Sequence, residues 1–283
     1  MPFPALNAYL KRLSAPSRAP STVWLNADGQ AQGRFFNCTL TSAFQPIRAL
    51  GGAELLGFEG LARGASATGP GLSLWKLLDH AASDDESVEL DRLCRMLHAI
   101  NFFRQPEAQG LDLYLNVHDR LLSAVSSNHG HAFRRILAAL SLPSAQIVLQ
   151  LPAASASRRW LVNYVADNYR RNGFRLALQV ATLAEAAEVL TQVRPDAVKI
   201  DARAFQQGAA LETLLRLAQA NGATVIFKSV ESQASLAMLE RTSARTGVPA
   251  CVQGYLIDPP RLALRSPAEC IVAPPQRTAA NCA

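Results

Sequence analysis

The 283-residue chain is long enough for one large domain, and its 49% hydrophobic content can supply a sizeable core. The net charge of +6 favours anionic ligands or partners. Because the Lys and Arg residues are scattered, we expect no sequence-specific nucleic-acid partner. No segment is apolar for long enough to cross a bilayer, and the first residues lack the apolar core of a signal peptide. The five cysteines have no spacing typical of metal ligands or disulfides. We therefore expect a cytoplasmic protein with reduced thiols and no membrane partner.

Residues 1–38 are predicted to form an extension ahead of the main domain. It begins with an amphipathic helix at Leu6–Leu13 and continues as a linker rich in Ser, Pro and Arg. The segments Thr22–Asn26 and Gln32–Phe36 then flank an Asp28-Gly29 pair, which is a strong signal for a tight turn. The pattern predicts a small hairpin on the rim of the main domain.

The main domain alternates apolar runs with segments of helical periodicity, which is the pattern of a parallel sheet wrapped by helices. The first two strands are joined by a short link around Gly51-Gly52, too short for a crossover helix, so they should be antiparallel. The predicted strands are Thr39–Ile47, Leu55–Leu61, Leu111–Val117, Gln146–Leu151, Arg175–Val180, Ala197–Asp201, Thr224–Ser229 and Cys251–Leu256. The predicted helices are Leu72–Ala82, Val88–Phe103, Phe133–Leu140, Ser155–Asn172, Leu183–Gln192, Leu211–Asn221 and Ser232–Arg245.

Several of these strands carry short motifs: FQPI at 44–47, FEGLAR at 58–63, VKID at 198–201 and VQGYL at 252–256. Together they resemble the EAL domain family over about Thr39 to Pro260. The resemblance implies an α/β fold, a modified TIM (β/α)8 barrel of EAL type with an antiparallel first strand. It places the barrel at residues 39–262 and leaves 263–283 as a C-terminal tail. Members of this family hydrolyse the bacterial second messenger cyclic di-GMP with two divalent cations held at strand ends.

The resemblance also assigns roles to individual positions, and in a barrel these converge on one face at the carboxyl ends of the strands. Glu59 and Leu61 belong to the family's signature, in which the glutamate is a metal ligand. Arg63 matches an arginine that contacts phosphate, and Asn116 matches a metal-binding asparagine. Lys199 matches the catalytic lysine, Asp201 the aspartate that follows it, and Glu231 a second glutamate. Gln253 and Gln45 match positions near the metal site and the guanine base.

Most of the family's other acidic residues are replaced in this chain. Gln150 and Ala153 stand at two glutamates, Gln179-Val180 at two bridging aspartates, and Lys228 at a further glutamate. Divalent cations prefer several carboxylate ligands. Two unit charges about 4 Å apart interact by roughly 4 kcal/mol at an effective dielectric near 20, so Lys228 would strongly repel a divalent ion. We therefore expect no bound metal, no cofactor and no catalytic residues.

Structural roles remain open for the same residues. Glu59 and Arg63 could form a rim ion pair, and Lys228 could replace the lost cations as a counter-charge to Asp201 or Glu59. Asn116 and Gln150 could simply hydrogen-bond within the rim. His129 and His131 are interpreted as solvated loop residues. The arginine pairs at 134–135, 158–159 and 170–171 are interpreted as solvated helix faces, with a basic docking surface as the alternative.

Two classes of function follow from this pattern. In one, the barrel mouth binds cyclic di-GMP without cutting it, using Gln45, Arg63, Asn116 and Gln253. In the other, the nucleotide site is vestigial and the outer helices bind a partner protein. We expect a catalytically inactive regulatory protein of cyclic di-GMP signalling that acts by binding a partner protein, and we leave open whether it also senses the nucleotide and whether it forms a homodimer. The alternative function is an active or weakly active cyclic di-GMP phosphodiesterase.

Overall fold

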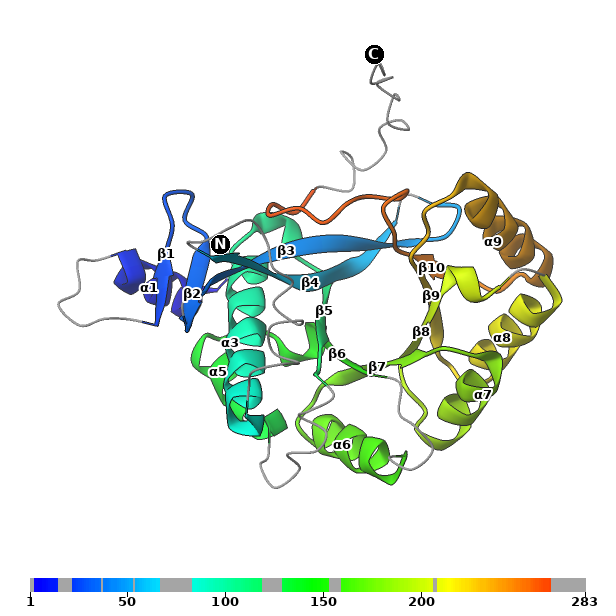
Figure 1. Ribbon diagram of the computed structural model, residues 1–283, viewed down its shortest axis with the longest axis horizontal. Helices are drawn as coiled ribbons and strands as arrows, with labels where there is room; N and C mark the ends of the chain where they lie inside the picture. The colour runs from blue at the N-terminus through cyan, green and yellow to red at the C-terminus, as the bar shows by residue number, and fades with distance from the viewer. Residues whose placement is uncertain are drawn as a thin grey trace, which may run out of the picture.

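The computed structural model describes residues 3–14, 22–36, 38–52, 54–66, 83–118, 129–152, 159–205 and 208–265. Within these ranges eight strands close into a barrel, and Figure 1 shows them as a ring with helices on its outside. The barrel strands are β3 (Cys38–Ala49), β4 (Leu55–Ser66), β5 (Asp112–Asn116), β6 (Ile147–Leu151), β7 (Arg175–Val180), β8 (Ala197–Asp201), β9 (Thr224–Lys228) and β10 (Cys251–Val252).

The first barrel strand runs against all the others. β3 is antiparallel to β4 on one side and to β10 on the other, whereas each neighbouring pair from β4 round to β10 is parallel. This confirms the predicted modified barrel with an antiparallel first strand. Because the other seven strands share one direction, their carboxyl ends lie at one end of the barrel, where side chains from distant parts of the sequence meet.

Helices cover the outside of the barrel, and their ends have recognisable sequence causes. Ser83 and Glu86 form a reciprocal capping box at the start of α3, and Thr182 accepts the N–H of Glu185 at the start of α7. Gly247, at φ 69°, ends α9 in the left-handed conformation. The helices are α3 (Asp84–Phe103), α5 (His129–Ala139), α6 (Arg159–Arg171), α7 (Leu183–Gln192), α8 (Gly208–Ala220) and α9 (Gln233–Thr246), with short 3-10 turns η1 (Pro106–Ala108), η2 (Ser144–Gln146) and η4 (Ala202–Ala204).

The N-terminal extension adds to the barrel's own sheet. Helix α1 (Pro4–Ser14) precedes a hairpin of β1 (Val23–Leu25) and β2 (Ala31–Phe35), whose turn contains the predicted Asp28-Gly29 pair. β2 pairs with the first residues of β3. Asn101 of α3 fixes this junction, because its side chain accepts the N–H of Ala31 and donates to the Ala31 carbonyl.

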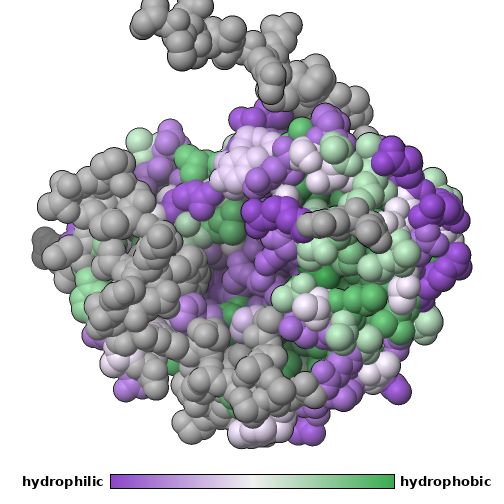
Figure 2. All heavy atoms as spheres, turned by 45° about the vertical axis from the view of Figure 1, so that its right-hand side comes forward, coloured by the Kyte–Doolittle hydropathy of each residue, from purple (hydrophilic) through white to green (hydrophobic). Residues whose placement is uncertain are grey.

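The barrel interior is apolar at one end and polar at the other. An apolar layer that includes Ile47, Tyr114, Val148 and Ile226 fills the end where the parallel strands begin. The layer nearer their carboxyl ends contains charged and amide side chains instead, and Figure 2 shows a hollow in one face of the barrel lined largely by hydrophilic residues. Buried polar side chains need hydrogen-bond partners. The pattern of hydrogen bonds in this layer therefore decides which groups at the barrel mouth are available to a ligand.

Some elements differ from the prediction. Helix α5 begins at His129, so His129 and His131 lie in its first turn, and the loop interpretation of these two residues is wrong. Strand β10 ends at Val252 because the chain turns at Gly254. The predicted helix Leu72–Ala82 and most of the C-terminal tail lie outside the described residues. Among the helices that are described, none is both long enough and apolar enough to span a membrane.

Candidate functional site: a lysine and amide network around Glu59

Glu59 of β4 is the centre of the polar layer. Its side chain is 11% exposed, and both carboxylate oxygens accept hydrogen bonds from the protein. Oε1 accepts from Asn116 Nδ2 at 2.7 Å and from Gln150 Nε2 at 3.1 Å. Oε2 accepts from Lys199 Nζ at 2.7 Å and from Gln253 Nε2 at 2.6 Å. Four donors, from β5, β6, β8 and the residue that follows β10, therefore occupy this one carboxylate.

Lys199 of β8 supplies the positive charge that balances Glu59. Its side chain is 2% exposed, and its ammonium also donates to Gln150 Oε1 at 2.9 Å. Gln150 of β6 thus bridges the pair, since its amide nitrogen donates to Glu59 while its amide oxygen accepts from Lys199. A neutral amide suits this position because it offers one donor and one acceptor to opposite charges.

A second part of the network leads towards the mouth through Gln179 of β7. Its Nε2 donates to Asn116 Oδ1 at 3.3 Å, and its Oε1 accepts from Lys228 Nζ at 2.8 Å. The prediction that Lys228 neutralises Glu59 or Asp201 is wrong, because Lys228 bonds an amide and Glu59 is paired with Lys199. Lys228 is half-buried, so its positive charge stays accessible at the mouth.

A third part connects the site to the segment after β10. Besides its bond to Glu59, Gln253 Nε2 donates to Gln45 Oε1 at 3.0 Å, and Gln45 Nε2 donates to the Asp258 carbonyl at 3.1 Å. Gly254 permits this arrangement, since a Cβ there would lie 2.1 Å from the Val230 carbonyl oxygen. Both ends of the Gln45 amide are therefore used within the protein.

The ion pair sets the protonation state of the site. Burial by itself would raise the pKa of Glu59, but the nearby Lys199 ammonium and the donated hydrogen bonds lower that pKa to about 2. Glu59 is therefore a carboxylate across the ordinary pH range. Burial lowers the pKa of Lys199, and the Glu59 carboxylate opposes this shift.

Several predicted site residues lie apart from the network. Arg63 is exposed and donates to the Ala62 carbonyl at 3.1 Å, and no ion pair between it and Glu59 is found among the described residues. Asp201 pairs with Arg203 at 2.7 Å, and hydrogen bonds from Arg203 lower the pKa of Asp201 to about 2. Glu231 is exposed, Leu61 is half-buried, and Ala153 lies outside the described residues.

Behind the network lies a cluster that the sequence analysis did not identify. His98 of α3 hydrogen-bonds through Nδ1 to Ser42 Oγ at 2.8 Å, and burial lowers the pKa of His98 to about 3. Gly60 allows this packing, because a Cβ there would lie 2.9 Å from His98 Cγ. Gly60 in the FEGLAR motif was the sequence signal that could have indicated a bulky neighbour at this position.

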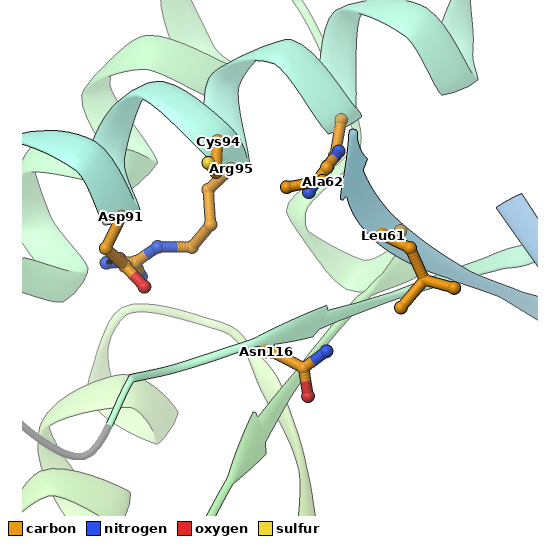
Figure 3. Close-up of a pocket in the computed structure, with 8 residues that line it drawn as sticks. Leu61, Ala62, Asp91, Cys94, Arg95 and Asn116 are labelled. Carbon is orange, nitrogen blue, oxygen red and sulfur yellow. Dashed lines mark ion pairs between the residues drawn. The ribbon is translucent and has the colours of Figure 1, made fainter. Parts of the chain in front are cut away.

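A small cavity of about 20 Å³ lies between α3, β4 and β5. Figure 3 shows Asp91 and Arg95 on α3 pointing toward one another, with Leu61 and Ala62 on β4 and Asn116 on β5. Arg95 is 1% exposed, forms an ion pair with Asp91 and lies over the Phe133 ring. The cavity has room for about one water molecule, so it fits a solvation site better than a ligand site.

The donor set does not fit the two cations that the family's chemistry requires. Glu59 already accepts four hydrogen bonds, one of them from an ammonium. The adjacent strand ends present the amides of Gln150 and Gln179 and the ammonium of Lys228, and an ammonium has no lone pair to offer a metal. Across the part of the chain that is described, no three His, Cys, Asp or Glu side chains are grouped to hold a metal ion.

Comparison with known proteins defines the class. The EAL domain family matches residues 29–260, so the chain belongs to the EAL domain family. Among solved structures, it is similar to the FimX EAL domain of Pseudomonas aeruginosa bound to c-di-GMP, with a TM-score of 0.67 and 20% identity over 79% of this chain and 91% of that one. No match was found among curated protein sequences.

Two longer proteins share the fold. BlrP1 of Klebsiella pneumoniae, in a manganese and cyclic di-GMP complex, gives a TM-score of 0.65 and 20% identity, covering 87% of this chain and 58% of that one. YkuI of Bacillus subtilis, in complex with c-di-GMP and calcium, gives 0.63 and 20%, covering 80% of this chain and 56% of that one. This chain thus spans less than two thirds of those two proteins.

Proposed function

We propose that this chain is a catalytically inactive EAL protein that acts in cyclic di-GMP signalling by binding a partner protein. The observation that carries the proposal is that positions of the family's acidic residues hold amides and an ammonium, with Gln150 bonded to Glu59 and Lys199, and Lys228 bonded to Gln179. Metal-assisted phosphodiester hydrolysis needs cations that polarise the phosphate and generate a hydroxide. A cation at Glu59 would have to displace the Lys199 ammonium and the amide donors, and few other carboxylates are there to hold it.

Hydrolysis assays test this part directly. Purified protein is incubated with cyclic di-GMP and magnesium or manganese, and we expect no linear dinucleotide above the level of a protein-free control. Manganese binding should also be absent when it is measured by electron paramagnetic resonance without nucleotide. Turnover that scales with protein concentration would refute the proposal and establish the alternative, an active or weakly active phosphodiesterase.

The internal use of the polar groups supports a protein partner over a nucleotide. Gln45, which the family resemblance places near the guanine base, has its amide nitrogen bonded to the Asp258 carbonyl and its amide oxygen bonded to Gln253. Glu59 and Gln150 are likewise fully engaged. A nucleotide would have to break these bonds in order to use the groups, whereas a partner on the outer helices would leave them in place.

Nucleotide sensing is the second candidate, and the positive mouth favours it. Lys228 is half-buried with its ammonium at the end of β9, and Arg63 is exposed on β4. Two cations of this kind suit a dianionic ligand. Calorimetric titration with cyclic di-GMP, with and without magnesium, tests this. Micromolar binding that is lost in Arg63→Ala would establish a receptor for cyclic di-GMP. No binding at millimolar nucleotide would leave protein binding as the remaining proposed function.

A further inference from the structure

Helix α6 carries a stripe of four exposed residues on its outer side. Trp160, Tyr164, Asp167 and Arg171 are spaced at i, i+4, i+7 and i+11, which places them along one line of a helix. All four are exposed, Trp160 at 69% and Tyr164 at 54%. We call these four residues the α6 stripe. Figure 1 shows α6 on the outside of the barrel, beside β6 and β7.

The other face of α6 already attaches the helix to the barrel. Leu161, Val162, Ala166 and Tyr169 are buried in the core. The two exposed aromatic rings therefore add little to the stability of the single chain, although large aromatic side chains cost the most when left in water. Tryptophan, tyrosine and arginine are also the residue types that dominate the energetics of protein interfaces.

The charges near the end of α6 are arranged so that one arginine stays available. Arg170 is held within the chain, because it contacts Asp167 at 3.6 Å and donates to the carbonyls of Val193 and Arg194. Arg171, next to it, is exposed and has no ion pair among the described residues. The α6 stripe thus runs from an aromatic half, Trp160 and Tyr164, to a charged half, Asp167 and Arg171.

This order makes the stripe complementary to itself. When two copies of α6 pair antiparallel about a two-fold axis, Trp160 lies opposite Arg171 of the second copy, and Tyr164 lies opposite Asp167 of the second copy. An arginine over a tryptophan ring is a favourable cation–π contact, and a tyrosine hydroxyl can donate to a carboxylate. We propose that the α6 stripe is the interface of a symmetric homodimer of this chain.

The dimer should be weak and concentration-dependent, since one helix face is smaller than a standard interface of about 1,600 Å². Sedimentation velocity over a range of micromolar concentrations is expected to show a reversible monomer–dimer equilibrium. Trp160→Ala should weaken association about tenfold or more. Tyr255→Ala is the matched control, because Tyr255 is 65% exposed but lies outside α6, and it should leave association unchanged. Unchanged melting temperatures would show that both variants fold.

A double-mutant cycle makes the test specific to the proposed pairing. Within one helix Trp160 and Arg171 are eleven residues, or about 16 Å, apart, so they should not couple inside a single chain. If they meet across the two-fold axis, the losses in dimerisation from Trp160→Ala and Arg171→Ala will not be additive. A chain that stays monomeric at every concentration, additive losses, or an equal loss in Tyr255→Ala would each overturn the proposal.

Discussion

Lys199 is the counter-ion of Glu59, and its ammonium lies 2.7 Å from the carboxylate with both side chains almost fully buried. The two residues come from β8 and β4, which lie on opposite walls of the eight-stranded ring. The pair therefore ties the barrel together across its interior. The interaction also uses the Glu59 carboxylate within the chain itself.

Removing the ammonium should be costly. Lys199→Met would leave the Glu59 carboxylate buried without a counter-charge, and breaking a buried pair in this way costs about 3–5 kcal/mol of unfolding free energy. Urea unfolding followed by circular dichroism measures the change. Adding Glu59→Gln to Lys199→Met should recover part of the loss, because it removes the unpaired charge.

Lys228→Met is the matched control, since the same substitution on the neighbouring strand removes an ammonium that bonds only the Gln179 amide in the described structure. It should cost no more than about 1.5 kcal/mol, the range of a single hydrogen bond. Equal losses for the two lysine variants would contradict the assignment of Lys199 as the counter-ion.

Acid should weaken the fold through Glu59. Its pKa is about 2 in the folded chain against an ordinary value of 4.5, so the folded state resists protonation. The resulting stability is fully present above about pH 5 and is lost as the pH falls from 4.5 towards 2, by about 3 kcal/mol. The free energy of unfolding should therefore fall less steeply in Glu59→Gln than in the wild type over this window.

His98 contributes a separate acid effect that begins at higher pH. Burial lowers its pKa from 6.5 to about 3, so the unfolded state binds the proton first, and stability falls as the pH drops below 6.5. His98→Ala should flatten the slope between pH 6.5 and 5, where Glu59 is ionised in both states. An unchanged slope in this variant would show that His98 is not held neutral.

Periodicity and turn chemistry were enough to predict much of the barrel. The bounds of β7, α7 and β8 agree with the sequence prediction, since local signals mark them: Thr182 caps α7, and the Asp201 side chain accepts the N–H of Arg203 where β8 ends. The short link at Gly51-Gly52 likewise identified the antiparallel strand, because no crossover helix fits there.

The hydrogen-bond and ion-pair partners within the site could not be predicted in the same way. The sequence indicated that Lys199 and Lys228 both lie at strand ends, but not which of them reaches Glu59. That depends on strand register: Lys228 pairs with Asp201, two residues and about 6–7 Å further along β8 than Lys199. The contact between His98 and Gly60 could not be predicted either. The two residues lie on α3 and β4, which are distant in sequence and meet only in the folded structure.

Gly60 and His98 should behave as a coupled pair. In Gly60→Ala the new Cβ would lie 2.9 Å from His98 Cγ, and overpacking of this kind costs about 1–3 kcal/mol. In a His98→Ala background the same substitution should be nearly neutral, because the ring is gone. Thermal and urea unfolding of the four proteins in this cycle give the coupling energy. Additive losses would mean that the close approach does not limit the residue at position 60.

Restoring one acid should weaken the protein without creating an enzyme. Gln150→Glu replaces the amide that donates to Glu59 at 3.1 Å with a second carboxylate, while the bond from Lys199 can remain. The lost donor and the like-charge contact should cost about 1–3 kcal/mol at neutral pH. Near pH 4.5 the cost should shrink, because a protonated carboxyl can donate again. We expect no hydrolysis of cyclic di-GMP by this variant, since Gln179 and Lys228 still occupy the other strand ends. A variant that is as stable as the wild type at neutral pH and cleaves the nucleotide with manganese would show that the site accepts cations readily.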